Sequence, residues 1–510
     1  MTERQLTYFA MTTVRVTATA ADGPRLLLLA ARRLCDAVGP HAALSAADGR
    51  LSARLGTGLH AEMFLSTEMR SGAPEASALG LTLRLLADDQ TRASVSAEHW
   101  AEIWHRQALT EPETDRLAGE LPLMSATVER LRHDKPLAGS ALLVTGHFLS
   151  DLVHLVRCLA ELGAPLEHMT VLRKDYAYQW RHRVHGYLEQ AGVRVAASTD
   201  TEAIHDHTRR GRNAGLRCLA LDDGGYVVPA LLGAPATAPP WAGVVEQTMS
   251  GIYRIQGQED ALPFPVFSVA GSRLKGRIES YWIAEKAVET ALSLLPATKI
   301  EGQPALVVGY GNVGAQVATL LDQRRMRVAV HNADILHLID AHENGFVTDR
   351  SLCALLSAHR PLIVFGATGR TCLSVPEFRA LRRPVYLASV SSRAIEFDLS
   401  ALQELAVENP ASRLMAGPPS RTWRIPGGTD VTVLAEGRPV NFHETDSISN
   451  LHSDLVYAGI LVGACAVASG QGRPGLDQTW ADDVLEASGL LEDYYERYGP
   501  PHGLTPSTGP

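Results

Sequence analysis

Lysine is scarce in this chain of 510 residues. Lysine and arginine together number 47, yet only five of the 47 are lysines. Arginine cannot give up its proton at working pH, so a lysine kept in such an arginine-rich chain is expected where an amine is needed. The lysines are Lys135, Lys174, Lys275, Lys286 and Lys299.

Paired cysteines are absent as well. The six cysteines occur singly, and no two of them are spaced as CxxC. This pattern predicts neither a zinc site nor a disulfide framework. We expect the cysteines to be small buried apolar residues, and we expect no metal.

The chain has no excess of positive charge. Acidic residues outnumber basic ones by 56 to 47, which gives a formal net charge of −9. A chain of this composition has no basic reservoir for phosphate backbones. We therefore expect a small-molecule ligand and no nucleic acid partner.

Neither a secretion signal nor a long hydrophobic run is evident. Residues 1–5 do not begin a charged and then apolar pattern, and the longest apolar run, residues 455–469, is shorter than a bilayer-spanning helix requires. These features predict a cytoplasmic protein with no membrane association.

Strand and helix patterns alternate along much of the chain. Between residues 140 and 235, apolar strand patterns such as SALLVTG and RCLALDD alternate with amphipathic helix patterns. This alternation is typical of a parallel α/β sheet. A long amphipathic helix over residues 272–295 leads into a second unit of the same kind and suits a hinge. The prediction is an α/β fold with two Rossmann-like lobes joined by hinge helices.

A glycine fingerprint lies in the second unit. In VVGYGNVGAQVATLL, residues 307–321, the residues Gly309, Gly311 and Gly314 form GxGxxG between a strand and a helix. The glycines permit a tight turn, a close approach of the backbone to pyrophosphate, and packing of the helix on the strand. The pattern predicts dinucleotide binding, with Asn312 and Val313 in the same turn.

The end of the following strand departs from the usual pattern. An acidic residue is expected there to hold the ribose 2′-hydroxyl of NAD, but the sequence has Asn332, with Asp334 two residues on. Asparagine can still hydrogen-bond a diol. The preference for NAD over NADP is therefore weaker than usual.

Several motifs occur together in a fixed order. The segments LALDDGGYV, VVEQTMSGIYRI, FSVAGSRLKGRIESYW, VVGYGNVG, FGATG and VLAEGRPVN resemble the adenosylhomocysteinase (S-adenosylhomocysteine hydrolase) family. The resemblance implies NAD as cofactor, a nucleoside substrate and a homo-oligomer, either a dimer or a tetramer. In that family NAD oxidises the ribose 3′-hydroxyl, the acidified C4′ proton is lost, the 5′ substituent leaves, water adds and the 3′-ketone is reduced again.

The patterns and the resemblance together divide the chain into five parts. Residues 1–115 carry plausible strands and helices without an interpretable motif, so they are expected to form an extra N-terminal domain of unknown role. The remaining parts are a substrate-binding domain at 116–271, an NAD-binding Rossmann domain at 272–440, a segment returning to the substrate lobe at 441–498, and a disordered tail at 499–510.

Four catalytic residues follow from the resemblance. Lys275 matches the family lysine of 3′-oxidation and C4′ deprotonation, and Glu279, one helical turn on, replaces the family's aspartate. At this spacing the two are also a common surface ion pair. His147 in VTGHFLSD and Asp223 in LDDGG match the histidine and carboxylate that transfer protons at the 5′ position. The alternatives are an ordinary histidine at a helix start and an aspartate that caps a turn.

Other site residues rest on the resemblance alone. For the substrate they include Asp151, which takes the place of an acidic contact to adenine. The full substrate set is Asp151, Gln247, Asp222 and His443. Beyond the glycine turn and Asn332, the cofactor set is Thr248 and Ser250 near the nicotinamide half, Ser280 on the long helix, Thr368 and Gly369 in the FGATG loop, and Asn441 near the carboxamide.

Three positions depart from the family. Gln247 replaces a glutamate, Ser280 an asparagine and Ser392 a histidine. The family's second histidine has no clean counterpart, although His443 or His452 could substitute for it. Acid–base groups typically supply about a hundredfold or more each. These losses disfavour ordinary hydrolysis of S-adenosylhomocysteine.

The leading hypothesis is a redox-neutral nucleoside lyase. Transient 3′-oxidation, C4′ deprotonation and loss of the 5′ substituent would leave a 4′,5′-unsaturated nucleoside, as an angustmycin-type dehydratase of antibiotic biosynthesis would. The enzyme alternatives are an S-adenosylhomocysteine hydrolase and an epimerase or oxidoreductase that uses the same 3′-ketone. An alternative of another class is a catalytically silent NAD-sensing regulator, for which Lys275 would have little use.

Overall fold

The structure is a computed structural model. It describes residues 6–19, 21–39, 42–47, 50–68, 77–174, 176, 178, 180–234, 241–258, 262–408, 420–427, 429–443 and 448–499. The chain divides into two compact units, one made of residues 1–120, 148–154 and 180–195 and the other of the remaining residues. The predicted tail at 499–510 lies, apart from Gly499, outside the described residues.

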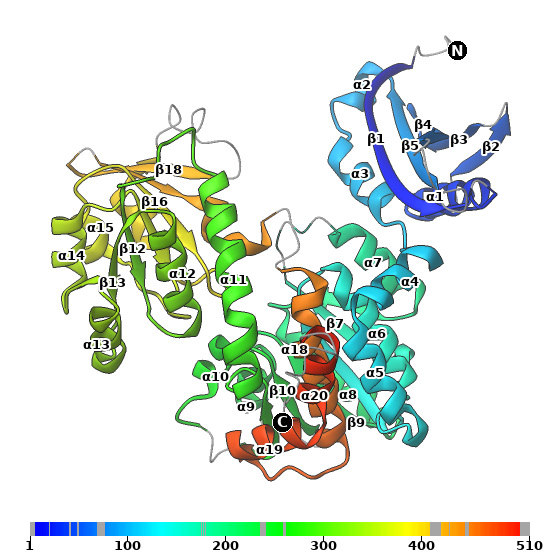
Figure 1. The fold of residues 1–510 in the computed structure, drawn as a ribbon. Helices are drawn as coiled ribbons and strands as arrows, with labels where there is room; N and C mark the ends of the chain where they lie inside the picture. The colour runs from blue at the N-terminus through cyan, green and yellow to red at the C-terminus, as the bar shows by residue number, and fades with distance from the viewer. Residues whose placement is uncertain are drawn as a thin grey trace, which may run out of the picture. The chain divides into compact units, whose positions relative to one another are not determined.

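The N-terminal part of the first unit is built on an antiparallel sheet (Figure 1). Its strand order is β1-β5-β4-β3-β2. Alternate leucines of β5 are buried, and Trp104 donates its indole N–H to the carbonyl of Leu81 at 2.9 Å. One face of the sheet therefore forms a core with the helices. The elements are β1 (Thr7–Ala18), α1 (Gly23–Asp36), β2 (Ala43–Ala47), β3 (Arg50–Gly56), β4 (Leu59–Glu68), β5 (Ser77–Ala87), α2 (Asp89–Arg92), α3 (Ala97–His105) and α4 (Glu111–Glu120).

A buried ion pair ties the first unit together. Glu113 of α4 binds the guanidinium of Arg183 through both carboxylate oxygens, at 2.8 and 2.6 Å. The same carboxylate accepts the backbone N–H groups of Thr17 and Thr110. Burial alone would raise the pKa of Glu113, but the hydrogen bond and charge of Arg183 lower it below its ordinary value. Residues distant in sequence are thus joined by one charged contact.

A seven-stranded sheet follows, in the order β20-β11-β10-β9-β6-β7-β8. The pairs from β20 to β7 are all parallel. Parallel strands covered on both faces are mostly apolar and buried, and every residue of Trp241–Glu246 is buried. The elements are α5 (Pro122–Leu131), η1 (Arg132–Asp134), β6 (Ser140–Gly146), α6 (Ser150–Glu161), η2 (Leu166–His168), β7 (Thr170–Arg173), α7 (Arg181–Gln190), β8 (Arg194–Ala197), α8 (Thr201–Asn213), β9 (Arg217–Asp222), α9 (Val227–Gly233), β10 (Trp241–Glu246), α10 (Met249–Ile255) and β11 (Pro265–Ser268).

The C-terminal segment returns to this sheet. It contains α18 (Asn450–Ala468), β20 (Gly475–Leu476), α19 (Gln478–Ala487) and α20 (Leu490–Tyr498). Asp454 of α18 accepts the backbone N–H groups of Leu123 and Met124 at 2.7 and 2.9 Å and so caps α5. This carboxylate satisfies two donors that a helix start leaves open.

The apolar run at residues 455–469 lies almost entirely within a longer helix, α18. Helix α18 has 19 residues and a mean hydropathy of 1.6, so by length and composition it could cross a bilayer. However, 72% of its apolar window is buried inside the protein. In this structure α18 is therefore a core helix.

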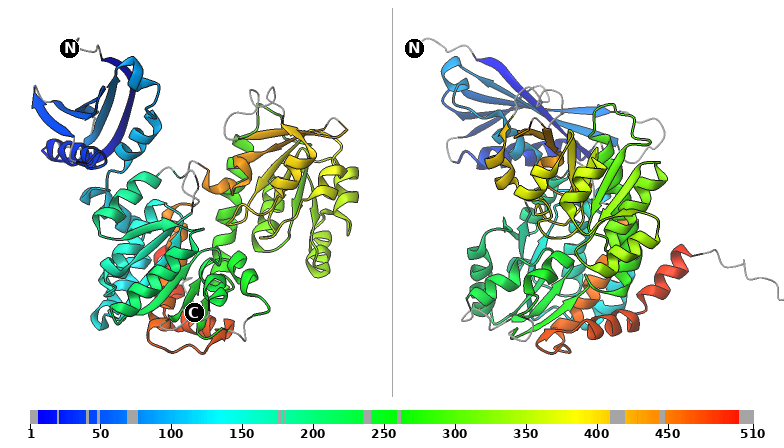
Figure 2. Two further views of the ribbon diagram at one scale, coloured as in Figure 1. Left: turned by 180° about the vertical axis from the view of Figure 1, so that it is seen from behind. Right: turned by 90° about the vertical axis from the view of Figure 1, so that its left-hand side faces the viewer.

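An eight-stranded sheet forms the rest of the second unit, in the order β14-β13-β12-β15-β16-β19-β18-β17 (Figure 2). Ala305 and Val307 of β12 pack with α11 and α12, whereas Leu306 and Val308 pack with α14 and α15. Both faces of the sheet are thus covered. The elements are α11 (Arg273–Ser293), β12 (Pro304–Val308), α12 (Asn312–Gln323), β13 (Arg327–His331), α13 (Ile335–Glu343), β14 (Val347–Thr348), α14 (Leu352–His359), β15 (Ile363–Gly366), α15 (Val375–Ala380), β16 (Val385–Ser389), α16 (Leu399–Leu405), β17 (Val407–Glu408), β18 (Arg421–Ile425), β19 (Thr429–Val433), η5 (Leu434–Gly437) and η6 (Val440–Phe442).

The predicted α/β class with two Rossmann-like sheets and an additional N-terminal domain is confirmed. One feature of the second sheet was not predicted. Strand β18 pairs antiparallel with both β17 and β19, so this edge of the sheet is mixed. Short antiparallel edge strands of this kind are common on parallel sheets.

The Glu113–Arg183 pair predicts a large loss of stability on neutralisation. Glu113→Gln leaves the guanidinium of Arg183 buried without a counter-charge, so the free energy of unfolding at pH 7 should fall by about 3–5 kcal/mol in urea titrations. Glu62→Gln, which breaks the half-exposed pair with Arg84, should cost only about 0–1 kcal/mol.

The same pair predicts a pH dependence. Because the folded pKa of Glu113 is depressed, its stabilisation is present above the ordinary glutamate pKa of about 4.3 and is lost as pH falls through the folded value. The difference in the free energy of unfolding between wild type and Glu113→Gln should therefore become smaller below about pH 4. An equal difference at pH 3 and pH 7 would contradict this account.

Candidate active site

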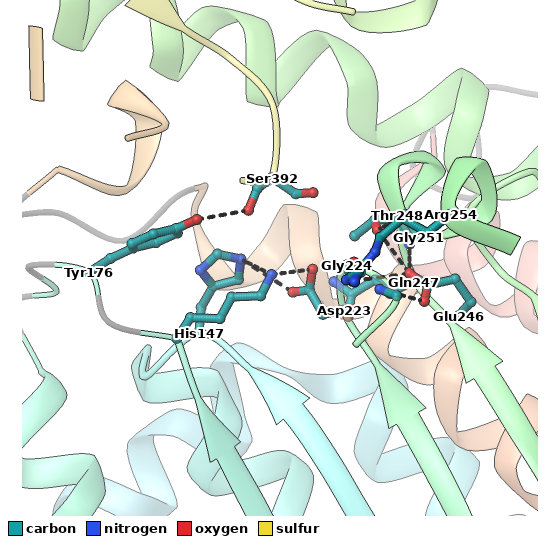
Figure 3. Close-up of polar contacts among 12 residues, drawn as sticks. His147, Tyr176, Asp223, Gly224, Glu246, Gln247, Thr248, Gly251, Arg254 and Ser392 are labelled. Atoms are coloured by element: carbon teal, nitrogen blue, oxygen red, sulfur yellow. Dashed lines mark hydrogen bonds and ion pairs between the residues drawn. The ribbon is translucent and has the colours of Figure 1, made fainter. Parts of the chain in front are cut away.

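Four strand ends of the seven-stranded sheet meet at one edge. The strands β10, β9, β6 and β7 are neighbours in that order, and the residues directly after them are Gln247, Asp223, His147 and Lys174. The carboxyl ends of parallel strands lie together, and ligands of open α/β sheets bind at this edge. Figure 3 shows His147 and Asp223 pointing toward each other there.

Three of these side chains form a compact charged cluster. The ammonium of Lys174 lies 2.6 Å from Asp223 Oδ1 and 3.1 Å from His147 Nε2. His147 Nε2 lies 3.3 Å from Asp223 Oδ2. The exposed fractions of His147, Lys174 and Asp223 are only 6%, 1% and 4%. Sequence reasoning brought His147 and Asp223 together but did not include Lys174.

Burial and mutual charge set the protonation of the cluster. Burial lowers the pKa of His147 to about 4, and the positive charge of Lys174 contributes to this shift. Burial alone would raise the pKa of Asp223, but the charges and hydrogen bonds of Lys174 and His147 hold it well below its usual range. At neutral pH Asp223 is therefore a carboxylate and His147 a neutral imidazole.

Aromatic side chains enclose this imidazole. Phe442 of η6 stacks on His147 with ring centroids 3.8 Å apart and an interplanar angle of 15°. His147 Nδ1 is hydrogen-bonded to the hydroxyl of Tyr178. The neighbouring Tyr176 donates its hydroxyl instead to the backbone carbonyl of Ser392 at 3.3 Å (Figure 3). The position of the missing family histidine thus contributes a carbonyl oxygen.

The predicted base lies at the start of α11. Ser272 caps this helix by accepting the backbone N–H of Lys275. Lys275 Nζ donates to the carbonyl of Gln247 at 2.8 Å and lies 3.2 Å from Glu279 Oε2. The charge of Lys275 also acts on His147 and lowers its pKa. Because Gln247 directly follows β10, the contact with its carbonyl places the Lys275 amine at the same strand edge as His147.

Two further carboxylates hold the backbone around this site. Asp222, which was predicted to bind substrate, accepts the backbone N–H of Val227 at 2.8 Å. Glu246 accepts the N–H groups of Gly224 and Gly225 at 3.2 and 3.1 Å (Figure 3). It also accepts both the N–H and the hydroxyl of Thr248 at 2.8 Å. Glu246 was not predicted as a site residue, because only the fold brings it to the turn that follows Asp223.

The glycine turn of the eight-stranded sheet has the shape that a pyrophosphate needs. A Cβ on Gly309, whose φ is 103°, would meet the Ala367 carbonyl oxygen at 2.5 Å, and one on Gly314 would meet the Gly309 oxygen at 2.0 Å. A Cβ on Gly311 would meet nothing within 4 Å. Helix α12 begins at Asn312 without a side-chain cap, so its first N–H groups are available to an anion. These features fit a dinucleotide.

The other predicted cofactor residues lie in ordered turns. Asn332 Oδ1 accepts the backbone N–H of Asp334 at 2.8 Å, which leaves its amide Nδ2 for a ribose hydroxyl. The backbone N–H groups of Thr368 and Gly369 both bind Glu396 Oε1 at 2.7 Å. Glu396 is fully buried and was not predicted. It fixes the FGATG loop.

The remaining predicted residues are placed as follows. Val313 packs against the core of the eight-stranded sheet, and the Ser280 hydroxyl donates to the carbonyl of Gly276 at 3.1 Å. His443 directly follows η6, and His452 stacks on Trp282 with centroids 3.6 Å apart. Ser250 in α10, Asn441 in η6 and Asp151 in the first turn of α6 are buried. Asp151 belongs to the first unit.

The fold and the glycine turn define an α/β protein that binds a dinucleotide. Residues 286–447 match the family model described as S-adenosyl-L-homocysteine hydrolase, NAD binding domain. The adenosylhomocysteinase of Thermotoga maritima is 25% identical over 343 residues, which cover 66% of this chain and 82% of that protein. The chain is thus similar to the adenosylhomocysteinase family, and the match to that family's NAD-binding domain supports NAD as its cofactor.

The chain is also similar to an uncharacterized protein and to a solved reductase. An uncharacterized protein of Mycobacterium tuberculosis is 29% identical over 360 residues, so the match spans 66% of this chain and 66% of that protein's length. The solved glyoxylate/hydroxypyruvate reductase of Sinorhizobium meliloti has 14% identity and a TM-score of 0.38, with 66% of this chain and 97% of that one covered. A score this low bears on no functional argument.

The glycine geometry predicts a binding defect without a folding defect. Gly311→Ala places a methyl group in open space beside the start of α12, so the thermal midpoint of the NAD-free protein should not change. Calorimetry should show NAD binding weakened at least about tenfold, because the backbone can no longer approach the pyrophosphate.

Two matched variants sharpen this test. Gly139→Ala, where a Cβ also meets nothing within 4 Å, should alter neither property. Gly314→Ala should lower the thermal midpoint, because the new methyl collides with the Gly309 carbonyl. Unchanged NAD affinity in Gly311→Ala would show that the cofactor does not lie against this turn.

Proposed function

We propose that this protein is an NAD-dependent, redox-neutral enzyme that modifies nucleosides. The reaction begins with transient oxidation of the ribose 3′-hydroxyl. It continues with C4′ deprotonation, elimination of the 5′ substituent and reduction of the 3′-ketone back to the hydroxyl, and it yields a 4′,5′-unsaturated nucleoside. The observation that carries the proposal is the presence of two separate proton-transfer groups in one site, Lys275 with Glu279 and His147 with Lys174 and Asp223.

The glycine turn supports the redox half of this reaction. Gly309, Gly311, Gly314 and the first turn of α12 would hold the pyrophosphate of the cofactor, and Asn332 the ribose. When bound, NAD supplies a reversible oxidation of a ribose hydroxyl. A ketone at C3′ acidifies the neighbouring C4′ hydrogen, so a base of ordinary strength can remove it.

Lys275 is suited to be that base. Its Nζ is held between the Gln247 carbonyl and Glu279, so the amine has one orientation at the end of β10. A neutral amine accepts the proton from C4′, and the Glu279 carboxylate stabilises the ammonium ion that results. The deprotonated C4′ then expels the group on C5′.

The His147 cluster serves the other proton transfer of this reaction, which is protonation of the departing 5′ group. A departing 5′ group needs a proton, and the hydrogen-bonded array around His147 is the other buried proton-transfer group among the described residues of this edge. Hydrolysis would need further acid–base groups to activate water. Gln247 and Ser392 stand where the family has a glutamate and a histidine, which favours elimination over hydrolysis.

The test is proton exchange at C4′. Adenosine and related nucleosides are incubated with the NAD-loaded protein in D2O and analysed by mass spectrometry. We expect deuterium at C4′ and a product lighter by one water. If deuterium appears at C4′ but the only product formed is one that requires homocysteine, the result would favour the hydrolase. NAD binding without exchange in any nucleoside would favour the NAD-sensing regulator.

Lys275 provides the decisive variant. Lys275→Met should reduce C4′ exchange by about 100-fold or more, because the base is lost, while NAD affinity stays within about threefold of wild type. Lys286→Met is the matched control, since Lys286 lies on the same helix but pairs with Glu289. Equal exchange in Lys275→Met and Lys286→Met would remove Lys275 from the reaction.

A further inference from the structure

We propose that Tyr178 gives the proton to the departing 5′ group and that Lys174 replaces that proton through His147. This inference rests on the proposed elimination and assigns its acid side. Tyr178 is the catalytic residue of the proposal, and Lys174 is a positioning residue that acts through the imidazole. Neither side chain has a role in the adenosylhomocysteinase resemblance.

The directions of the hydrogen bonds follow from the chemistry of lysine. An ammonium group has three donors and no acceptor. Lys174 therefore donates both to Asp223 Oδ1, at 2.6 Å, and to His147 Nε2, at 3.1 Å. With Nε2 accepting from Lys174, rather than donating to Asp223 Oδ2 at 3.3 Å, the proton of the neutral imidazole is on Nδ1. The ion pair thus fixes the tautomer of His147.

The fixed tautomer determines what Tyr178 can do. His147 Nδ1 carries the proton, so it donates to the Tyr178 oxygen in the hydrogen bond between them. The O–H of Tyr178 is then directed away from the imidazole and can donate to another group. Protons can therefore pass in one direction, from Lys174 through His147 to Tyr178. The hydroxyl of Tyr178 is the final donor.

His147 itself is a poor source of the proton. Both of its ring nitrogens are engaged, Nε2 by Lys174 and Nδ1 by Tyr178, and Phe442 covers one face of the ring. Burial also lowers the pKa of His147 to about 4, so the imidazolium form is rare at neutral pH. The ammonium of Lys174, which contacts both His147 and Asp223, is the proton source that remains in the cluster.

The step balances without any further reagent. The electron pair of the C4′–H bond forms the C4′–C5′ double bond, and the C5′–O bond breaks. The departing oxygen takes the proton of Tyr178, Tyr178 takes one from His147 Nδ1, and His147 Nε2 takes one from Lys174. Lys174 then recovers a proton from water. Lys275 releases to water the proton that it took from C4′, so no net proton is gained or lost.

The relay indicates the class of substrate. Hydroxide is a far poorer leaving group than a thiolate, so an oxygen substituent leaves C5′ readily only when it is protonated. A buried ammonium ion that feeds a hydroxyl donor suits this demand. The structure therefore points to nucleosides with oxygen at C5′, which leave water or an alcohol.

The experiment compares leaving groups. Tyr178→Phe keeps the ring and removes the donor, so loss of water from adenosine should slow by about 100-fold or more while C4′ exchange continues. Elimination of chloride from 5′-chloro-5′-deoxyadenosine needs no proton and should proceed at the wild-type rate. A variant that was merely damaged in packing would lose both eliminations and would overturn the proposal.

A matched control is available next to the relay. Tyr176→Phe removes a hydroxyl that donates to the Ser392 carbonyl rather than to His147, and water loss should continue. Lys174→Arg keeps a cation beside Asp223 but cannot release a proton at working pH, so it should lose water elimination and keep chloride elimination. Should arginine not fit, Lys174→Met combined with Asp223→Asn removes both charges and should give the same pattern.

Two outcomes separate this inference from the function on which it rests. If wild type shows no C4′ exchange, the proposed function fails and the relay has no reaction to serve. If wild type exchanges C4′ and Tyr178→Phe still releases water at the wild-type rate, only the relay is wrong.

Discussion

The ion pair between Lys174 and Asp223 controls the chemistry of the whole strand edge. Two opposite charges lie 2.6 Å apart with almost no exposure to water, so neither can be removed without leaving the other uncompensated. Lys174 and His147 hold the pKa of Asp223 well below its usual range, whereas burial, helped by the charge of Lys174, lowers the pKa of His147 and keeps it neutral. It also fixes which imidazole nitrogen carries the proton. The fold thus determines the protonation state of the site, because it sets the burial and the charged neighbours of each group.

The parallel sheet supplies the positions for this pair. His147, Lys174 and Asp223 each follow directly after a strand, and their strands are neighbours in the order β9, β6, β7. Lys174 is 27 residues from His147 and 49 from Asp223 in sequence, yet all three meet within hydrogen-bonding distance. Below them Glu246 binds three backbone N–H groups, so the turn that carries Asp223 is fixed by a second buried carboxylate.

Much of this arrangement could be predicted from the sequence. The resemblance to the adenosylhomocysteinase family brought His147 and Asp223 together, and GxGxxG located the dinucleotide turn. Lys174 could not be placed from the sequence, because local periodicity does not predict the order of β6 and β7 in the sheet. The scarcity of lysine was nevertheless a signal, and it applied to Lys174 as much as to Lys275. Glu246 and Glu396 were missed because their partners are backbone groups, which have no sequence signature.

The two halves of the proposed chemistry are carried by different sheets. The dinucleotide turn belongs to the eight-stranded sheet, which contains most of the stretch that matches the family model, whereas the Lys174 cluster belongs to the seven-stranded sheet. Substitutions at the ends of β6, β7 and β9 need not disturb the packing of Gly309 and Gly314. Evolution can therefore replace the leaving-group chemistry while the redox chemistry is inherited unchanged. Under the proposed function, one cofactor-binding sheet can therefore serve leaving-group sites of different chemistry.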